Sequence, residues 1–221
     1  DLEQLDLSDL DNIAAFAGRI RERHDRIDLL ILNAGVMVPP ESKTAQGFEL
    51  QIGVNHLGHF ALTGALLPLV QDSEGARIVV VSSMAAQFGK MDFEDLHFFQ
   101  RGYSASAAYG QSKLANQLFV RELQRRLDKA GASVRVTAAH PGWTATDLQR
   151  TSGFARFLNP IVAMKPPQGA LPTLRAAIDP QARPADYFGP HGLMQMRGYP
   201  VSVPMVKAAM SDEDAARLWS V

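Results

Sequence analysis

Two kinds of apolar pattern alternate along the chain: short continuous runs rich in Val, Ile and Leu, and longer segments in which apolar residues recur at helical spacing. The short runs predict buried strands, and the helical spacing predicts helices packed against them. The predicted strands cover residues 28–33, 78–82, 134–139 and 187–188, and the predicted helices cover about 47–70, 109–130, 168–178 and 211–219. This alternation is typical of an α/β fold around a parallel sheet.

The beginning of the chain predicts one strand end and one helix. Residues 2–7 resemble the tail of a strand, and the run Ser8-Asp9-Leu10-Asp11 resembles a capping box that begins a helix ending near residue 22. In the later helix at 109–130, the polar residues expected on the solvent side are Glu122, Arg125 and Arg126.

Composition favours a globular domain without a strong charge bias. The 221 residues are 46% hydrophobic and 20% charged, with a net charge of −1, which predicts a single domain over residues 1–221 and gives no electrostatic reason to expect nucleic acid or an anionic membrane as partner. The absence of cysteine excludes disulfides and thiol chemistry and fits a reducing, cytoplasmic location. We expect neither a signal peptide nor a membrane span, because the longest apolar stretch, residues 60–70, is far short of the roughly 20 residues required.

Small polar residues follow three of the predicted strands. Asn33-Ala34-Gly35 follows the first strand, Ser82 and Ser83 end the second, and His140-Pro141-Gly142 follows the third. The carboxyl ends of parallel strands meet at one edge of a sheet, and ligands bind there in open α/β folds. These residues are therefore expected to line one crevice.

Tyr109 and Lys113 lie four residues apart in a predicted helix, which places a phenol and an ammonium on the same face. A cation close to a tyrosine favours the phenolate and lowers its pKa from about 10. The pair could then act as a general acid and base. Taken alone, the same spacing more often means a surface tyrosine packed on a lysine stem, so the interpretation depends on the polar strand ends.

Taken together, these elements resemble the short-chain dehydrogenase/reductase family over nearly all of the chain. They occur in the family's order: Asn-Ala-Gly at 33–35, Asn-x-x-Gly-x-Phe at 55–60, Ser-Ser at 82–83, Tyr-x-x-x-Lys at 109–113 and Pro-Gly-x-x-x-Thr at 141–146. The segment around Tyr109 is most similar to the retinol dehydrogenase and protochlorophyllide reductase-like branch. The resemblance implies a Rossmann-like, doubly wound parallel sheet between two helical layers, a three-layer αβα fold.

The same resemblance implies hydride transfer between a nicotinamide cofactor and an alcohol or carbonyl carbon. Tyr109 would give or take the proton of the substrate oxygen, and Ser83 would orient that oxygen, with Ser82 structural. Lys113 would lower the pKa of Tyr109 and hold the nicotinamide ribose. Asn55 would hold a water that relays protons to the lysine, although an Asn in an apolar helix can also simply bind a helix carbonyl.

The family pattern also implies a set of cofactor contacts. NADP is favoured over NAD, and Thr146 is expected to contact the nicotinamide carboxamide with its side chain. The full set of expected cofactor-binding residues is Asp6, Leu7, Asn33, Ala34, Gly35, Tyr109, Lys113, Pro141, Gly142, Thr144 and Thr146.

One expected element is absent from this sequence. No Gly-x-x-x-Gly-x-Gly run precedes Asn33, although a dinucleotide fold needs a glycine-rich turn against the pyrophosphate. Residues 5–9 match the end of the family's third strand, so the resemblance implies an N-terminally incomplete sheet that lacks two βα units, with the inner edge of the strand at 28–33 left open. A chain truncated in this way is expected to be unstable and inactive, and an intact mass well above 24.1 kDa would show that the units exist.

The segment between Ser83 and Tyr109 is long and aromatic. Residues 85–108 contain Phe88, Phe93, Phe98, Phe99 and Tyr103, and further apolar residues, Phe154, Phe157, Leu158 and Ile161, follow Thr146. They favour a bulky lipophilic carbonyl or alcohol as substrate, such as a retinoid, steroid or aromatic ketone. The alternative is that the segment packs on its own domain or on a second subunit of a homo-oligomer.

Two other functions are compatible with parts of this pattern. Sugar-nucleotide epimerases share Tyr-x-x-x-Lys, but they carry a larger substrate domain than the 108 residues after Lys113 provide. A noncatalytic fragment or interaction module would explain the missing glycine-rich run, and cofactor binding would discriminate it. His56 and His59 lie three residues apart, on one face of a predicted helix, but no third residue at metal-ligand spacing lies nearby in the sequence. We therefore predict that both histidines pack in the fold and that the protein binds no metal.

Overall fold

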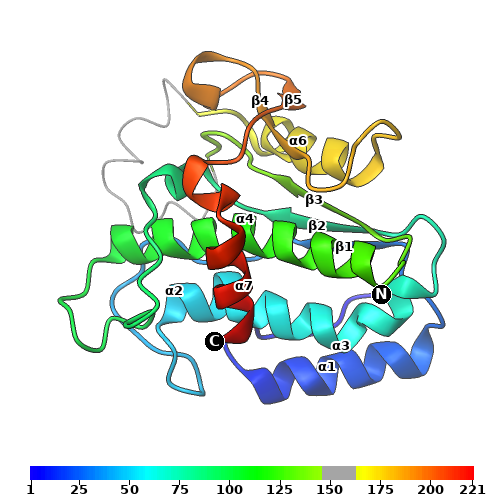
Figure 1. Cartoon of the computed structure of the whole chain (residues 1–221), viewed down its shortest axis with the longest axis horizontal. Coiled ribbons are helices and arrows are strands. Elements are labelled where there is room, and N and C mark those ends of the chain that lie inside the picture. The colour runs from blue at the N-terminus through cyan, green and yellow to red at the C-terminus, as the bar shows by residue number, and fades with distance from the viewer. Residues whose placement is uncertain (146–162) are drawn as a thin grey trace.

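A five-stranded sheet forms the centre of the computed structural model, which describes residues 1–145 and 163–221 (Figure 1). The strands lie in chain order and are β1 (Leu29–Leu32), β2 (Arg77–Val81), β3 (Arg135–Ala139), β4 (Tyr187–Pro190) and β5 (Pro200–Ser202). The first four are parallel, and β5 pairs antiparallel with β4. The predicted α/β fold and its first four strands are therefore confirmed, whereas β5 was not predicted.

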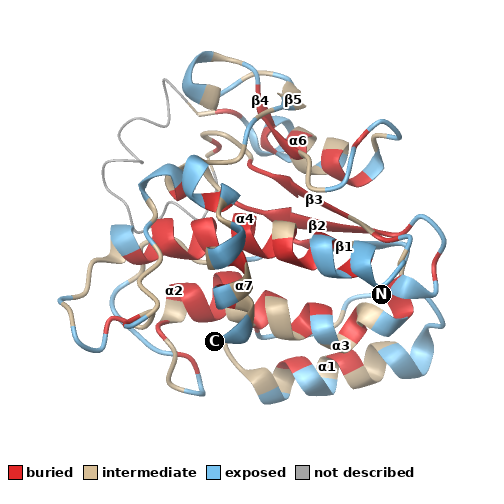
Figure 2. Ribbon diagram, in the orientation of Figure 1, coloured by how far each residue is buried: buried red, intermediate tan, exposed pale blue. Residues whose placement is uncertain are grey.

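Helices cover both faces of this sheet. They are α1 (Leu10–Arg23), α2 (Leu50–Ile52), a π-helix (Gly53–Gly58), α3 (His59–Gln71), α4 (Ala105–Lys129), α6 (Pro166–Ile178) and α7 (Asp212–Ser220). Alternate residues of β2 face opposite layers: Ile78 and Val80 pack in the core with α1, α3 and α4, while Val79 packs with α6. The three-layer αβα arrangement is thus confirmed, and Figure 2 shows how burial concentrates in β2, β3 and α4.

The N-terminal segment differs from the prediction. Residues 2–7 form no strand: Asp6 N donates to Asn12 Oδ1 at 2.8 Å, and β1 pairs only with β2 among the described residues. Leu29 and Ile31 of β1 are 45% and 40% exposed, in line with the expected open edge. The N-cap residue of α1 is Asp9, whose carboxylate accepts a hydrogen bond from Asp11 N. Ser8 does not cap the helix, because its hydroxyl donates to the Asp6 carboxylate.

Two helical predictions are also corrected. The helix expected from residue 47 begins at Leu50, where the Glu49 carboxylate accepts the N–H groups of Gln51 and Ile52. Glu122 was expected on the solvent side of α4, but it is 2% exposed. The guanidinium groups of Arg125 and Arg126 each lie 2.7 Å from it and keep it paired, which lowers its pKa. None of the described helices is long and apolar enough to cross a membrane.

Candidate active site

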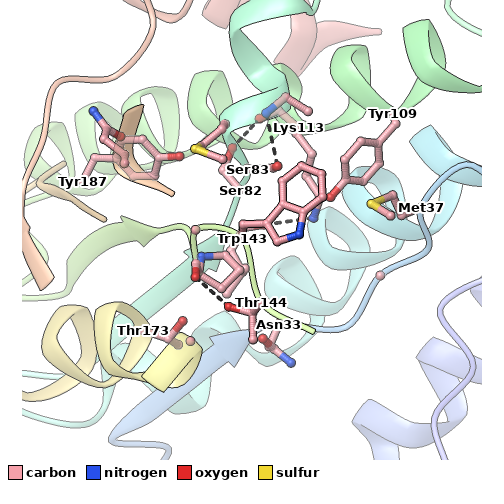
Figure 3. Close-up of a pocket in the computed structure, with 18 of the residues that line it drawn as sticks. Asn33, Met37, Ser82, Ser83, Tyr109, Lys113, Trp143, Thr144, Thr173 and Tyr187 are labelled. Carbon is pink, nitrogen blue, oxygen red and sulfur yellow. Dashed lines mark hydrogen bonds between the residues drawn. The ribbon is translucent and has the colours of Figure 1, made fainter. Parts of the chain in front are cut away.

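A cavity of about 1480 Å³ opens at the carboxyl ends of the parallel strands (Figure 3). Residues from the ends of β1, β2 and β3 line it together with the first turns of α4, as the polar strand ends predicted. The residues expected at the site that do line it are Asn33, Ala34, Gly35, Ser82, Ser83, Tyr109, Lys113, Pro141, Gly142 and Thr144. The fold therefore brings most of the candidate residues to one place.

Tyr109 lies in the second turn of α4, which Ser104 caps by accepting from Ala107 N. The side chain is 8% exposed. Burial raises the pKa of the phenol, and a hydrogen bond with Ser83 lowers it by a smaller amount. The pKa of Tyr109 is therefore shifted upward, opposite to the direction expected from Lys113, because desolvation is its largest cause. Tyr109 is thus a protonated donor at neutral pH.

Lys113 is held below the end of β2. Its Nζ donates to the Val81 carbonyl at 3.2 Å, and Asn116 Nδ2 donates to the same oxygen at 3.1 Å. Complete burial lowers the pKa of Lys113 to about 8, so the ammonium form still dominates at neutral pH but gives up its proton more readily than an exposed lysine.

The two serines after β2 have different environments. Ser82 Oγ donates to the Lys113 carbonyl at 2.7 Å and joins β2 to α4, which agrees with a structural role. Ser83 Oγ accepts from Ala85 N at 3.2 Å and caps the short 3-10 helix Met84–Phe88. Ser83 is the serine close enough to Tyr109 to lower its pKa, and both side chains line the cavity.

Asn55 does not line the cavity, but it holds one part of the cavity wall in place. The side chain is fully buried; its Oδ1 accepts from Val36 N at 2.8 Å, while Nδ2 donates to Val36 O and to Ser112 Oγ, both at 2.9 Å. The Asn55 carbonyl lies 3.1 Å from the ring nitrogen Nδ1 of His59. Asn55 therefore ties the loop after Gly35 to α4, and the relay role remains a prediction.

The expected cofactor contacts divide into two groups. The nicotinamide end fits the residues present, because a buried cation and a phenol donor suit ribose hydroxyls, and the loop at 141–144 presents backbone groups beside them. Thr144 Oγ1 donates to the Pro141 carbonyl at 2.8 Å and shapes this loop. For the pyrophosphate, the described ranges 1–145 and 163–221 place no glycine-rich helix N-terminus at the cavity.

Asp6, Leu7 and Thr146 are not placed in the cavity. The Asp6 carboxylate accepts from Ser8 N at 2.8 Å and from Ser8 Oγ at 2.7 Å, which lowers its pKa. Leu7 packs in the hydrophobic core. Thr146, like the apolar residues predicted at 154–161, lies outside the described residues.

The aromatic segment 85–108 contributes less to the cavity than expected. Only Ala85, Gln87 and Phe88 from it line the cavity, whereas Met91 and Phe93 pack against Leu114 and Leu118 of α4. Most of the segment thus packs on its own domain. His56 contacts the rings of Phe60 and Phe119, in agreement with a packing role.

Sequence reasoning missed the loop between β4 and β5. Met194, Gln195 and Met196 of this loop line the cavity. The only available signal was the pair of methionines, which are common in adaptable apolar sites.

Comparisons with known proteins agree with this geometry. A family model described as short chain dehydrogenase matches residues 2–155. Human retinol dehydrogenase 13 is 42% identical over 98% of this chain and 65% of its own length, and mouse retinol dehydrogenase 14 is 38% identical over 100% and 65%. The chain thus spans just under two thirds of the length of these relatives.

Among solved structures, an uncharacterized protein from Mycobacterium Paratuberculosis superposes with a TM-score of 0.81 and 42% identity, covering 100% of this chain and 73% of that one. The RhlG/NADP complex of Pseudomonas aeruginosa has a TM-score of 0.60 at 24% identity, over 83% and 72%, and shows the fold alone. The chain belongs to the short-chain dehydrogenase/reductase family of enzymes, in its retinol dehydrogenase branch.

Proposed function

We propose that this chain carries the catalytic half of an oxidoreductase that transfers a hydride between a nicotinamide cofactor and the carbonyl or alcohol carbon of a lipophilic substrate. The observation that supports this most is the meeting of a buried phenol, a serine hydroxyl and a buried ammonium in one cavity: Tyr109, Ser83 and Lys113. A proton donor, an orienting hydroxyl and a cation are what reduction of a carbonyl requires of the protein.

Each side chain has a separate task in this proposal. The nicotinamide supplies the hydride when it is bound. Tyr109, protonated because burial raises its pKa, gives its proton to the substrate oxygen during reduction and takes it back during oxidation. Ser83 orients that oxygen by a hydrogen bond. Lys113 would bind the ribose hydroxyls and replenish the proton, and Asn55 keeps the loop beside Gly35 in place.

The lipophilic character of the substrate rests on the cavity wall. Apolar side chains make up much of the lining, among them Met37, Met84, Phe88, Trp143 and Leu174. Phe88 is 81% exposed in the absence of a ligand. The relatives are retinol dehydrogenases by name, so a retinoid is the first candidate. NADP is preferred over NAD on the resemblance to this branch alone; a cytoplasmic location and a homo-oligomer also stay predictions.

The test is consumption of NADPH by the purified protein in the presence of all-trans-retinal, with NADH as the comparison. The control is Tyr109→Phe, which removes only the hydroxyl. We expect turnover in the wild type and none in the variant, with NADPH binding unchanged. Equal rates in the two proteins would refute the assigned role of Tyr109.

A noncatalytic module is the second candidate, because residues 1–145 and 163–221 place no glycine-rich helix N-terminus at the cavity to hold a pyrophosphate. The two candidates differ in cofactor binding, which NADPH fluorescence measures directly. A 221-residue chain that binds no NADPH would support the noncatalytic candidate, because the pyrophosphate contributes much of the affinity in dinucleotide folds.

A further inference from the structure

The segment at residues 191–199, here the β4–β5 loop, closes one side of the cavity. Met194, Gln195 and Met196 line the cavity, and Met194 is still 71% exposed. Two consecutive residues of this loop have left-handed backbones, with φ of 51° at Met194 and 55° at Gln195. Non-glycine residues in this region are strained and persist only where surrounding contacts hold them.

A buried histidine supplies one of these contacts. His140 follows β3 and is 1% exposed. Its Nδ1 accepts from Gly142 N at 3.2 Å, so the proton of the neutral ring is on Nε2, which donates to Gln195 Oε1 at 2.8 Å. Burial lowers the pKa of His140 to about 4, and the ring is therefore neutral at physiological pH. One side chain thus binds the loop at 141–144 and the β4–β5 loop at once.

A second contact joins the same two loops. Trp143 N donates to the Met196 carbonyl at 2.7 Å. A Cβ on Gly142 would lie 2.5 Å from that carbonyl, so the backbones approach as closely as glycine permits. The two loops therefore form one unit, and the strained residues Met194 and Gln195 lie within it.

We propose that His140 is a positioning residue that, through Gln195, fixes Met194 and Met196 as the apolar wall for the bulky part of the substrate, and so determines the size of substrate the enzyme accepts. This inference rests on the proposed function, because it assigns the wall to the substrate side of the same cavity. The His140–Gln195 hydrogen bond does not touch the reacting atoms. Its loss should weaken the binding of a large ligand and leave the chemistry at Tyr109 and Ser83 unchanged.

Two variants at one position test the hydrogen bond. Gln195→Met keeps the length of the side chain but removes the acceptor, whereas Gln195→Glu keeps an acceptor oxygen. Both variants place a non-glycine residue in the same left-handed backbone conformation, so the backbone strain is matched between them. The first readout is trypsin cleavage after Arg197, which is exposed in the loop, followed by mass spectrometry of the fragments. We expect faster cleavage in Gln195→Met than in the wild type and in Gln195→Glu.

The second readout is ligand size. Quenching of tryptophan fluorescence measures binding of all-trans-retinal and of butanal, since Trp143 lines the cavity. In Gln195→Met, retinal should bind about tenfold more weakly, as expected for loss of one hydrogen bond, while butanal binding stays unchanged. Tm should fall slightly, because the buried Nε2 of His140 loses its acceptor. In turnover assays, KM for retinal should rise by the same factor with kcat unaltered. His140→Phe also removes the acceptor of Gly142 N, so it should weaken retinal binding at least as much as Gln195→Met does, and adding Gln195→Met to it should cause no further loss.

Equal retinal affinity in the wild type and Gln195→Met would overturn the proposal, as would equal weakening for retinal and butanal, which indicates a general structural defect. Faster cleavage without a change in retinal affinity would also overturn it. Absence of turnover in the wild type would refute the proposed function, while the trypsin and binding measurements would still decide the role of the loop.

Discussion

As the pH is lowered, this protein should lose stability at pH values above those at which its carboxylates are protonated. The reason is that three histidines are buried in the neutral form. Burial lowers the pKa of His56, His59 and His140 to about 4 each. An unfolded histidine has a pKa of about 6.5. Between these two values the unfolded chain binds protons that the folded chain rejects, so the free energy of unfolding decreases as the pH falls below 6.5.

The size of this effect follows from the pKa differences. Lowering the pH from about 7 to about 5 costs about 1.8 kcal/mol of stability for each such histidine, and about 5.5 kcal/mol for the three together. Domains of this size are stable by roughly 5–15 kcal/mol, so a large part of the stability is at stake. The paired carboxylates, such as Glu122 and Asp179, have lowered pKa values and contribute only at still lower pH.

Urea unfolding followed by tryptophan fluorescence at several pH values between about 5 and 7 measures the slope. The control is His59→Gln, which should remove about a third of the pH dependence while its stability near pH 7 is reduced only moderately. A free energy of unfolding that stays constant between pH 7 and 5 would refute the reasoning, and so would an unchanged slope in His59→Gln.

Three further predictions concern single residues. Tyr109→Phe should abolish turnover while NADPH affinity, measured by fluorescence, stays unchanged; a variant that retains activity contradicts the mechanism. Leu218→Ala, at a side chain 7% exposed in the core beneath α7, should cost about 2–3 kcal/mol in urea unfolding, and a loss below about 0.5 kcal/mol would show that α7 is not packed as described. Gly189→Ala should destabilise by about 1–3 kcal/mol, because its Cβ would lie 2.0 Å from Nε2 of His140; an unchanged Tm would mean that β4 shifts freely.

Strands β1 to β4 could be predicted from the sequence to within one or two residues, because a continuous apolar run is a local property of the pattern. β2, for instance, is buried at every position, and a continuous apolar run expresses this directly. The position of the candidate site could also be predicted from local pattern. Small polar residues such as Asn33 and Ser83 follow parallel strands, and the carboxyl ends of parallel strands lie at the same edge of the sheet.

Other features depend on contacts that no local pattern records. The pKa of Tyr109 is raised mainly by burial, which depends on the packing of the whole molecule. A prediction based on the neighbouring Lys113 alone therefore gave the wrong direction for the shift. Glu122 is charged, yet packing of α4 buries it. The bond between His140 and Gln195 joins residues 55 positions apart, and a sequence without an alignment contains no sign of it.

The π-helix at Gly53–Gly58 makes this region intolerant of changes in length. Its wide turn holds one residue more than an α-helical turn. Before the π-helix, the side chain of Gln51 accepts a hydrogen bond from Val38 N. After it, Leu62 and Leu66 pack in the hydrophobic core. Removing one residue between them would restore regular winding but rotate one half against the other by about 100°. Either the loop that lines the cavity or the core would then lose its contacts, so a deletion scan should find here a stretch in which the number of residues is constrained as well as their identity.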